Sequence, residues 1–405
     1  MNLPVFIARR IKDPALGTFS SMIHGIAIIN ISVGLCIMII AVTIKVGYKK
    51  TITDKVATFS GHLEVTKYTV NSTYEDLPVS RDSESFKKIQ NLPFIEHIQG
   101  VAHKVALIKT KNEIQGVVFK GIGSDYDTDR FQVNITKGRF LQFPDSSISN
   151  EILISNKISQ LLNIKVNDQI LVYFIHNPVR IRKFRVCGIY DSGMEEFDEK
   201  IVFGDIKLIQ QLNKWSPGQF GTFEVFVNNV DQLSDVEKKL FELTDYDLYV
   251  DNMRDKYAEI FDWLSLIDRN VTILLVPLLS VVSFNMISIL IILIMERTQM
   301  IGLLKALGAT NNQIRRIFWY NGTRLIVYGL FWGNLLGIGF GIIQEKFKLI
   351  HLDPENYYMR YVPIQWDWIA ITGLNLLILV FVSLTLYLPT LMISRIQPIR
   401  AIKFD

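Results

Sequence analysis

The sequence predicts an integral membrane α-helical bundle of four transmembrane helices, with a large α+β domain inserted between helices 1 and 2. Three observations predict this fold class: four long apolar stretches, a polar segment of about 220 residues between the first two, and basic residues gathered near one set of helix ends. A helix that crosses a ~30 Å hydrocarbon layer needs about 20 mostly apolar residues. All four apolar stretches meet that requirement.

The expected segments follow the apolar stretches in chain order. They are an N-terminal amphipathic segment (1–20), transmembrane helix 1 (21–46), an external domain (47–268), helix 2 (269–295), a connector (296–316), helix 3 (317–344), an external loop (345–365), helix 4 (366–392) and a tail (393–405). Aromatic residues at the helix ends are typical of membrane interfaces, and here they are Trp319, Tyr320, Trp366 and Trp368.

The orientation follows from basic residues close to the helix ends, because cytoplasmic loops carry an excess of Lys and Arg. One basic cluster precedes helix 1, a second lies between helices 2 and 3, and a third follows helix 4. In that order, the clusters are Arg9, Arg10 and Lys12; Arg297, Lys305, Arg315 and Arg316; and Arg395, Arg400 and Lys403. This orientation places a fourth cluster, Lys45, Lys49, Lys50 and Lys55, on the external side. The cluster is compatible with it, because large translocated domains do not follow the charge rule. We therefore expect both termini in the cytoplasm.

Helix 1 has a basic start and an apolar middle, as a cleaved secretory signal does. Its apolar run is too long for a signal peptide, and no small-residue cleavage pattern follows at Lys45–Lys50. We expect an uncleaved anchor.

The external domain shows strand and helix patterns, and it is long enough for one large or two small domains. Alternating residues predict strands over 62–68, 101–110 and 114–119, the last two joined by a turn at Lys111 and Asn112. Helical spacing predicts helices over 83–90, 156–162, 205–212 and 234–243. The domain is therefore expected to be α+β.

The sequence offers no catalytic or metal-binding motif. A net charge of +4 over 405 residues gives no nucleic-acid footprint. There is no Gly-x-x-x-x-Gly-Lys-Ser/Thr loop, so the chain is not expected to hold ATP in the P-loop manner. The six histidines lack metal-binding spacing, no Gly-x-Ser-x-Gly elbow occurs, and Cys36 and Cys187 fall in different parts of the predicted topology. We expect no catalytic residue, no metal and no disulfide.

Helix 3 carries a glycine at every fourth position, at Gly329, Gly333, Gly337 and Gly341. Such a stripe lets two helix backbones approach closely. It fits a sliding contact in a moving transporter, and it fits static packing. Asn334 beside the stripe and Asn375 in helix 4 are candidates for a hydrogen bond between helices, and Pro277 is expected to kink helix 2.

The connector between helices 2 and 3, Glu296–Phe318, is basic and amphipathic. Its spacing predicts a short helix, a break after Gly308, and a second helix with Thr310 as N-cap. On the residues alone, two interpretations are equal. Either the connector lies on the lipid surface, or it docks into a groove of a cytoplasmic ATPase.

The stretch Arg297-Thr-Gln-Met-Ile-Gly-Leu-Leu-Lys-Ala-Leu-Gly-Ala-Thr310 closely resembles the coupling segment of FtsX/MacB-like ABC transporter permeases. Residues 393–403 resemble the Ala-x-x-x-Pro-x-x-Ala ending of that family, with Ser394 in place of the first alanine. Within the superfamily, the sequence resembles the LolC/LolE lipoprotein-releasing subunits over nearly the whole chain. The landmarks lie at 6–10, 61–65, 151–157, 162–168, 184–193 and 197–198.

The resemblance implies a periplasmic domain of two intertwined subdomains, and a dimer with a second permease copy or paralogue bound to two LolD-like ATPase subunits. It also implies a task. Such a non-catalytic subunit of the bacterial inner membrane extracts lipoproteins from membrane lipid and passes them to a LolA-like periplasmic carrier and the outer membrane. By this resemblance the chain binds no cofactor, and the partner ATPase uses ATP and Mg.

By analogy with the family, three groups of residues carry this task. ATPase coupling is expected at Arg297, Ile301, Leu304, Lys305 and Leu307. The lipoprotein path is expected at Ile31, Leu35, Met38, Val276, Leu279 and Phe284, positions that also fit ordinary packing or bilayer-facing residues. Carrier docking is expected on the hairpin 173–184, at His176, Arg180 and Arg182, which equally fit a solvated hairpin face.

Two features depart from the family pattern. Met300 stands where many relatives carry an acidic residue, and the hairpin 173–184 is short beside the LolC hook that captures the carrier. The sequence disfavours two alternative functions. A MacB-like mechanotransmission or efflux permease is disfavoured by the lack of a fused ATPase, and an FtsX-like regulator of a cell-wall hydrolase is disfavoured by the large external domain.

Overall fold

The computed structural model describes residues 19–68, 76–110, 113–144, 147–175 and 178–395. These residues form two units. The helical unit comprises described residues up to 50, 263–351 and 361–395, and the sheet unit comprises described residues of 51–262 and 352–360. Some of the predictions concern residues outside the described ranges. They are the basic residues before position 19 and after position 395, and the turn at Lys111 and Asn112.

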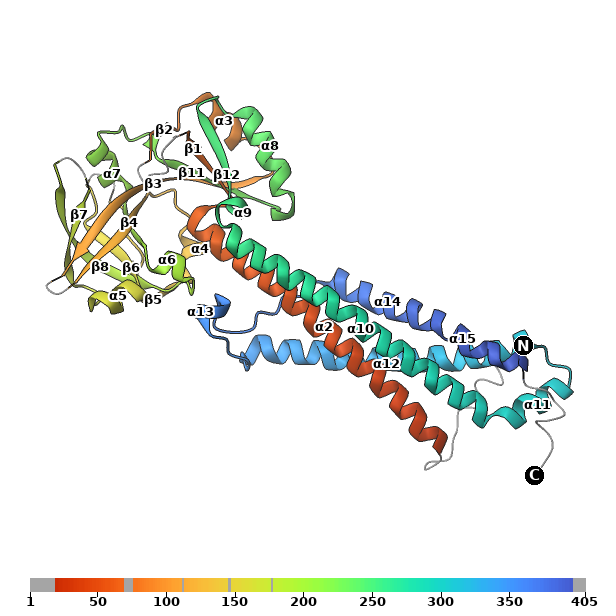
Figure 1. The fold of residues 1–405 in the computed structure, drawn as a ribbon. Coiled ribbons are helices and arrows are strands. Elements are labelled where there is room, and N and C mark those ends of the chain that lie inside the picture. Colours follow the sequence, from red (N-terminus) through yellow and green to blue (C-terminus); the bar gives the residue numbers. More distant parts are fainter. Residues whose placement is uncertain (1–18, 69–75, 111–112, 145–146, 176–177, 396–405) are drawn as a thin grey trace. The chain divides into compact units, whose positions relative to one another are not determined.

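The helical unit is built from four long helices that run side by side (Figure 1). They are α2 (Phe19–Ser60), α10 (Ala258–Glu296), α12 (Asn311–Phe347) and α14 (Trp368–Thr385). α11 (Thr298–Ala306) joins α10 to α12, and α14 continues through α15 (Tyr387–Thr390) into η2 (Leu391–Arg395). With the continuation of α14 included, all four are long and apolar enough to cross a membrane, so the predicted transmembrane helices are confirmed.

α2 and α10 are longer than their apolar stretches. α2 continues to Ser60, whereas its predicted membrane segment ends at residue 46, and α10 begins at Ala258 rather than 269. Neither extension contains a proline, and none of the residues after Gly47 in α2 is a glycine, so nothing interrupts the helices where the side chains become polar. Pro277 lies inside α10, which is continuous around it.

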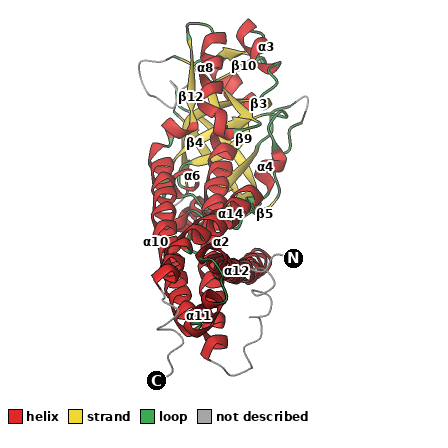
Figure 2. Cartoon of the chain, turned by 90° about the vertical axis from the view of Figure 1, so that its right-hand side faces the viewer, coloured by secondary structure: helices red, strands yellow, loops and turns green. Residues whose placement is uncertain are grey.

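The sheet unit contains one large mixed sheet and a small two-stranded pair (Figure 2, strands in yellow). The large sheet consists of β1 (Leu63–Lys67), β3 (Ile95–Lys109), β4 (Ile114–Ile122), β5 (Ile135–Gly138), β6 (Glu151–Ser155), β7 (Gln169–Phe174), β8 (Arg180–Tyr190), β9 (Ile201–Asp205), β11 (Thr222–Val227) and β12 (Leu248–Asn252). The pair is β2 (Val79–Ser80) with β10 (Gln219–Phe220). β1, β3 and β4 confirm the three predicted strands.

Six of these strands form a closed ring of pairings. β3 pairs with β4, β4 with β9, β9 with β6, β6 with β8, β8 with β7, and β7 again with β3, which makes a barrel. The first part of β3, Ile95–Val101, pairs instead with β11, which leads to β1 and β12. One strand is therefore shared by the barrel and by a four-stranded layer, and the two subdomains are intertwined.

Short helices connect the strands. α3 (Glu84–Gln90) and α8 (Leu233–Leu243) pack on the four-stranded layer, and α5 (Asn156–Leu162) and α7 (Ile206–Asn213) pack on the barrel, so the four predicted helices are confirmed. Three more lie between strands: α4 (Thr128–Gln132), α6 (Glu195–Asp198) and η1 (Val230–Gln232). α9 (Met253–Lys256) lies between β12 and α10, and α13 (Pro354–Tyr357) lies between α12 and α14.

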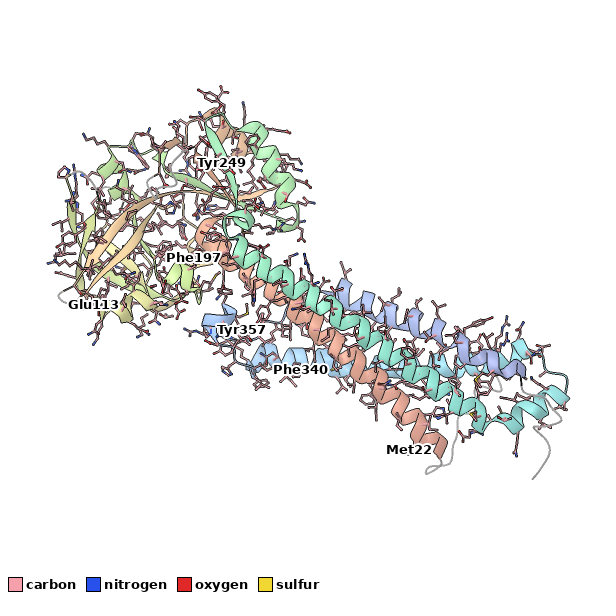
Figure 3. All side chains as sticks on the ribbon, viewed as in Figure 1. Met22, Glu113, Phe197, Tyr249, Phe340 and Tyr357 are labelled. Atoms are coloured by element: carbon pink, nitrogen blue, oxygen red, sulfur yellow. The ribbon has the colours of Figure 1, made fainter. Side chains whose placement is uncertain are left out.

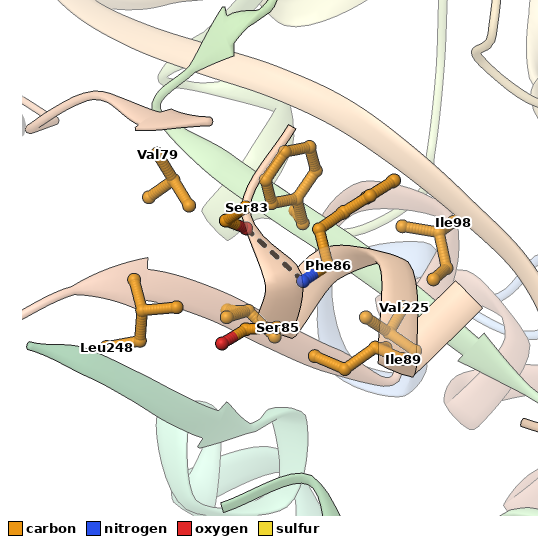
Figure 4. A pocket seen from close by; sticks show the side chains of 10 residues that line it. Val79, Ser83, Ser85, Phe86, Ile89, Ile98, Val225 and Leu248 are labelled. Carbon is orange, nitrogen blue, oxygen red and sulfur yellow. Dashed lines mark hydrogen bonds between the residues drawn. The ribbon is translucent and has the colours of Figure 1, made fainter. Parts of the chain in front are cut away.

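Each subdomain has its own core. In the barrel subdomain, Phe59 from the end of α2 stacks on Phe197 with ring centroids 4.7 Å apart and meets Phe131 at 5.5 Å. In the other subdomain, α3 covers a small pocket, and the Ser83 hydroxyl caps α3 by accepting the Phe86 N–H at 3.2 Å (Figure 4). Apart from two serines the pocket is lined by apolar side chains, so it belongs to the core of that subdomain.

Candidate functional site

One face of α11 is bound to the helical unit. Ile301 is fully buried, and Met300 and Leu304 pack against the apolar core that the long helices form. The Lys305 ammonium donates to the Ile393 carbonyl oxygen at 2.7 Å. This face therefore holds the connector to the helices that it joins.

The other face of α11 is exposed. Leu303 and Leu307, one helical turn apart, are 56% and 76% exposed. The chain then turns at Gly308, whose φ of +90° lies in the left-handed region that glycine favours. Thr310 caps α12, since its hydroxyl accepts the Gln313 N–H at 3.3 Å while the Gln313 side chain accepts the Thr310 N–H at 2.9 Å. The predicted N-cap is confirmed.

The glycine stripe of α12 lies against α2. A Cβ built on Gly329, Gly333 or Gly337 would come within 2.6, 2.9 and 3.2 Å of the Cβ atoms of Ile31, Leu35 and Ile39, respectively. The fourth glycine, Gly341, faces the Trp366 ring instead. The Ser32 hydroxyl also reaches across and donates to the Gly329 carbonyl at 3.1 Å. The two helices are thus closer than any residue other than glycine would allow without displacing a neighbour.

A pair of asparagines ties α12 to α14. The Asn334 amide donates to the Asn375 side-chain oxygen at 2.6 Å, and the Asn375 amide donates back to Asn334 at 3.0 Å. Each amide also donates to the carbonyl four residues earlier in its own helix. The polar groups are therefore satisfied within an apolar surrounding.

A buried lysine of the barrel holds the C-terminal end of α2. Lys120 on β4 and Glu224 on β11 are fully buried, and their ammonium and carboxylate lie 2.5 Å apart. The Lys120 ammonium also donates to the Phe59 carbonyl at 2.6 Å, and the Tyr126 hydroxyl donates to the Thr58 carbonyl at 3.1 Å. A cation is favourable at a helix C-terminus. The barrel subdomain thus binds the last turn of α2 through Lys120, whose charge is paired by Glu224 of the other subdomain.

The loop between α12 and α14 is held within the sheet unit by two cations. Lys55 on α2 donates to the carbonyls of Ser192 and Tyr358 at 2.5 and 2.7 Å. Arg360 pairs with Asp191 at 2.6 Å. Burial lowers the pKa of the Lys55 amine. Tyr358 has a φ of +57°, an unusual value for a non-glycine residue, at the point where its carbonyl meets Lys55.

β7 and β8 form the hairpin predicted over 173–184. His176, between these two strands in the sequence, lies outside the described residues. Arg180 and Arg182 are half-buried and alternate onto the same side of β8 as the buried Phe184. Large apolar side chains are exposed around the hairpin end, at Leu107, Leu171, Ile175, Val179 and Ile181.

Two family models match the chain. The MacB-like periplasmic core domain matches residues 25–242, more than half of the chain, and the FtsX-like permease C-terminal domain matches residues 272–398. The chain belongs to the FtsX/MacB-like permease superfamily.

Curated relatives of this permease include several lipoprotein-releasing system transmembrane proteins. LolC of Buchnera aphidicola subsp. Schizaphis graminum is 22% identical over 95% of this chain and 94% of its own length. LolE of Haemophilus influenzae is 22% identical over 98% of each chain. Among solved structures, the periplasmic region of MacB from Actinobacillus actinomycetemcomitans matches 49% of the permease and 91% of its own chain, at 12% identity and a TM-score of 0.35.

The predicted coupling residues of the permease divide between the two faces of α11. Leu307 is on the exposed face, and Arg297 precedes the helix and is half-buried. The bound face carries Ile301, Leu304 and Lys305. The prediction omitted Leu303, which shares the exposed face, although its four-residue spacing from Leu307 is a signal in the sequence.

The predicted lipoprotein-path residues do not share one surface. Those on α2 are buried inside the helical unit: Ile31, Leu35 and Met38. On α10, Leu279 is half-buried against the same core, whereas Val276 and Phe284 are 63% and 69% exposed. As the helices stand, the α2 residues are covered by their neighbours.

The outward face of α2 carries a different row of apolar residues. Its exposed members follow each other at three- and four-residue intervals: Met22, Ile26, Ile29, Val33 and Ile37. Met22, at the start of this outward row, is labelled in Figure 3. Sequence reasoning missed the row because α2 is apolar on all sides, so periodicity does not distinguish its faces.

No group of three or more His, Cys, Asp or Glu side chains among the described residues of the permease is placed to hold a metal ion, and Cys36 and Cys187 are both free.

Proposed function

We propose that this permease is the membrane subunit of an ABC transporter that releases lipoproteins from the inner membrane. The observation that carries the proposal is the similarity to LolC and LolE proteins, which extends over nearly the full length of both this chain and those relatives. The sequence contains no P-loop, so ATP would be hydrolysed on a separate subunit.

In this proposal the connector is cytoplasmic and the sheet unit is periplasmic. The support is the excess of Lys and Arg in the connector, next to the ends of two long helices. The assembly would contain a second permease, either another copy or a paralogue, and two ATPase subunits.

We assign ATPase docking to the exposed face of α11. An amphipathic helix whose outer face carries leucines one turn apart suits binding in an apolar groove. Leu303 and Leu307 would enter that groove, while Ile301 and Leu304 pass the movement to the helices against which they pack.

We assign the path of the lipid-modified substrate to exposed apolar residues of α2 and α10. Moving acyl chains into water costs about 0.8 kcal/mol per CH₂, so a sheltered apolar route and an energy source are both required. The outward row of α2, with Val276 and Phe284 of α10, supplies exposed apolar surface for such a route. The hairpin carrying Arg180 and Arg182 is the proposed docking point for a periplasmic carrier.

Depletion of the permease tests this function. In cells that lose the chain, we expect mature outer-membrane lipoproteins to accumulate in the inner-membrane fraction. Re-expression of the wild-type chain should restore their sorting, and so should a Leu161→Asp control at an exposed leucine outside the connector. Normal lipoprotein sorting combined with a drug-efflux or cell-division defect would instead favour a MacB-like or FtsX-like role.

A further inference from the structure

α12 carries an arginine inside its predicted membrane stretch. Arg324 lies four residues beyond Tyr320, which together with Trp319 marks the membrane interface. At a rise of 1.5 Å per residue, Arg324 is about 6 Å deeper along the helix than Tyr320. A charged side chain at membrane depth needs a partner and is by default a functional candidate.

Arg324 belongs to a ridge of alternating arginines and tyrosines. Arg316, Tyr320, Arg324 and Tyr328 are spaced four residues apart, so they follow one ridge of α12, which we call the arginine ridge. The Arg324 guanidinium lies over the Tyr328 ring, 5.6 Å from its centroid. In the described part of the chain, neither arginine of the ridge forms an ion pair with a carboxylate.

The arginine ridge faces away from the core of the helical unit. Arg316 is exposed, Arg324 is half-buried, and Tyr320 and Tyr328 are 42% and 44% exposed. The glycine stripe on another side of α12 is buried against α2. Further along α12 the exposed side chains are apolar: Val327, Phe331, Trp332 and Leu335. A molecule that binds along this side of α12 would therefore be apolar where it contacts the apolar residues and anionic where it contacts Arg324.

A phospholipid has this chemistry. Its acyl chains suit the apolar residues, and the planar guanidinium fork suits its phosphate. Side chains of an α-helix lean towards the helix N-terminus, which in α12 is the connector end. Arg324 is thus positioned to reach back towards the headgroups on that side of the membrane.

We infer that the arginine ridge binds the phosphate of an anionic phospholipid, in the leaflet next to the connector. The site is separate from the exposed face of α11, and it does not depend on which substrate the permease carries. It makes the stability of the helical unit depend on the lipid composition of the membrane.

The test uses the full-length permease reconstituted in phosphatidylcholine vesicles with or without phosphatidylglycerol. Native mass spectrometry after extraction counts retained phosphatidylglycerol, and thermal unfolding measures its effect on stability. We expect wild-type protein to retain the lipid and to unfold at a higher temperature when it is present. The double variant Arg316→Gln/Arg324→Gln should bind it more weakly, by roughly fivefold per arginine.

A matched variant distinguishes an effect of the ridge arginines from a general effect of lost positive charge. Lys346→Gln/Lys348→Gln removes two positive charges at the other end of the α12 region and should retain the lipid like wild type. If the double arginine variant does not fold, Arg324→Lys keeps the charge but loses the planar fork, and it should still retain less lipid. Equal retention in wild-type and arginine variants would overturn the inference. So would equal loss in the lysine control, or the same thermal shift from inorganic phosphate alone.

Discussion

Lys120 shows how a single buried charge can support several elements. Its ammonium is enclosed by Glu224 and the Phe59 carbonyl, and the second Glu224 oxygen accepts the Gln99 amide at 2.7 Å. Protein groups therefore take the place of water around both buried charges. Removing one charge leaves the other buried and uncompensated.

We expect Lys120→Met to destabilise the protein by about 3–5 kcal/mol, because Glu224 loses its counter-ion and Phe59 its donor. Chemical or thermal unfolding of the full chain measures the effect. The double variant Lys120→Met/Glu224→Gln should recover much of the loss. Lys88→Met, at an exposed ion pair with Glu84, should change stability by less than about 0.5 kcal/mol. Similar unfolding curves for all three variants would contradict this role of the buried pair.

His62 makes the stability of the sheet unit depend on pH. Its Nδ1 accepts the Val227 N–H at 3.0 Å, so the proton is on Nε2, which is buried and has no hydrogen-bond partner among the described residues. Burial and then Arg130 lower the pKa of His62 from 6.5 to about 4. Between those values the unfolded chain binds a proton here and the folded chain does not. The contribution of neutral His62 to the free energy of unfolding is therefore fully present above pH 6.5, and it decreases as the pH falls towards 4.

The expected loss from His62 over that interval is about 2–3 kcal/mol. His62→Asn keeps an acceptor near the Nδ1 position but cannot titrate, so the slope of stability against pH should become flatter. His351→Asn, at an exposed histidine of the helical unit, serves as the control and should leave the slope unchanged. Unfolding curves measured from pH 7 to pH 4 check both variants, and an unchanged slope in His62→Asn would refute the assignment.

The contacts of single residues could be predicted from the sequence only where the partner residue is close by in the chain. The Thr310 N-cap could be predicted because Gln313 is three residues away. The Lys120–Glu224 pair could not, because it joins β4 to β11 through pairings that leave no trace in local periodicity.

At the scale of elements, the two faces of α11 allow a loss of docking to be distinguished from a loss of packing. Leu303 and Leu307 are exposed, whereas Leu304 packs against the core of the helical unit. A polar residue on the outer face therefore affects only what docks there. A polar residue on the inner face also weakens the helical unit.

We expect Leu303→Asp/Leu307→Asp to abolish stimulation of the partner ATPase while the unfolding temperature of the permease stays unchanged. Leu304→Asp should lower both. ATPase assays of the reconstituted complex and thermal unfolding of the permease measure the two quantities. Normal ATPase stimulation by the outer-face variant would show that the ATPase docks elsewhere.

The glycine stripe offers a test on a single helix. A Cβ at Gly333 would meet the Leu35 Cβ at 2.9 Å and the Ser32 carbonyl oxygen at 3.0 Å, whereas a Cβ at Gly339 meets nothing within 4 Å. We expect Gly333→Ala to destabilise the permease by about 1–3 kcal/mol through overpacking. Gly339→Ala should be neutral or stabilise by up to about 1 kcal/mol through helix propensity. Unfolding measurements that rank the two variants in the opposite order would contradict the close contact of α12 with α2.

The elements themselves were largely predictable, because apolar length and alternation report local structure directly. The ends of α2 and α10 were not, since their extensions are polar and differ from loops only in lacking proline and, beyond Gly47, glycine. The faces of α2 could not be distinguished because this helix is apolar on all sides, and the predicted path residues Ile31, Leu35 and Met38 lie on its buried side.

At the scale of the whole molecule, the chain crosses between the helical unit and the sheet unit at four places, after residues 50, 262, 351 and 360. The last two crossings exist because the loop between α12 and α14 is held by Lys55 and Arg360. Sequence reasoning treated this loop as a simple external connection. Lys55 binds backbone carbonyls, which any residue can provide, and Arg360 pairs with a carboxylate that is far away in the sequence, so no local motif predicts the attachment.

We expect Lys55→Met/Arg360→Ala to release the loop, since it loses the ammonium contact to Tyr358 and the ion pair with Asp191. Hydrogen exchange of residues 352–360 should become faster, and their backbone more sensitive to protease. Lys137→Met, at an exposed lysine elsewhere in the sheet unit, should leave the loop protected. Unchanged exchange in the double variant would mean that the two cations do not hold the loop.

This attachment decides where foreign sequence can be inserted into the chain. A turn between two long helices is usually a convenient place for an epitope tag or a fluorescent label. Here an insertion within 352–360 would separate Tyr358 from Lys55 and Arg360 from Asp191. Glu113, which is labelled in Figure 3, is exposed, and its hydrogen bonds in the described part of the chain go to Thr110, three residues earlier. An insertion beside Glu113 would break no long-range contact of this kind, so it is the better place for a label.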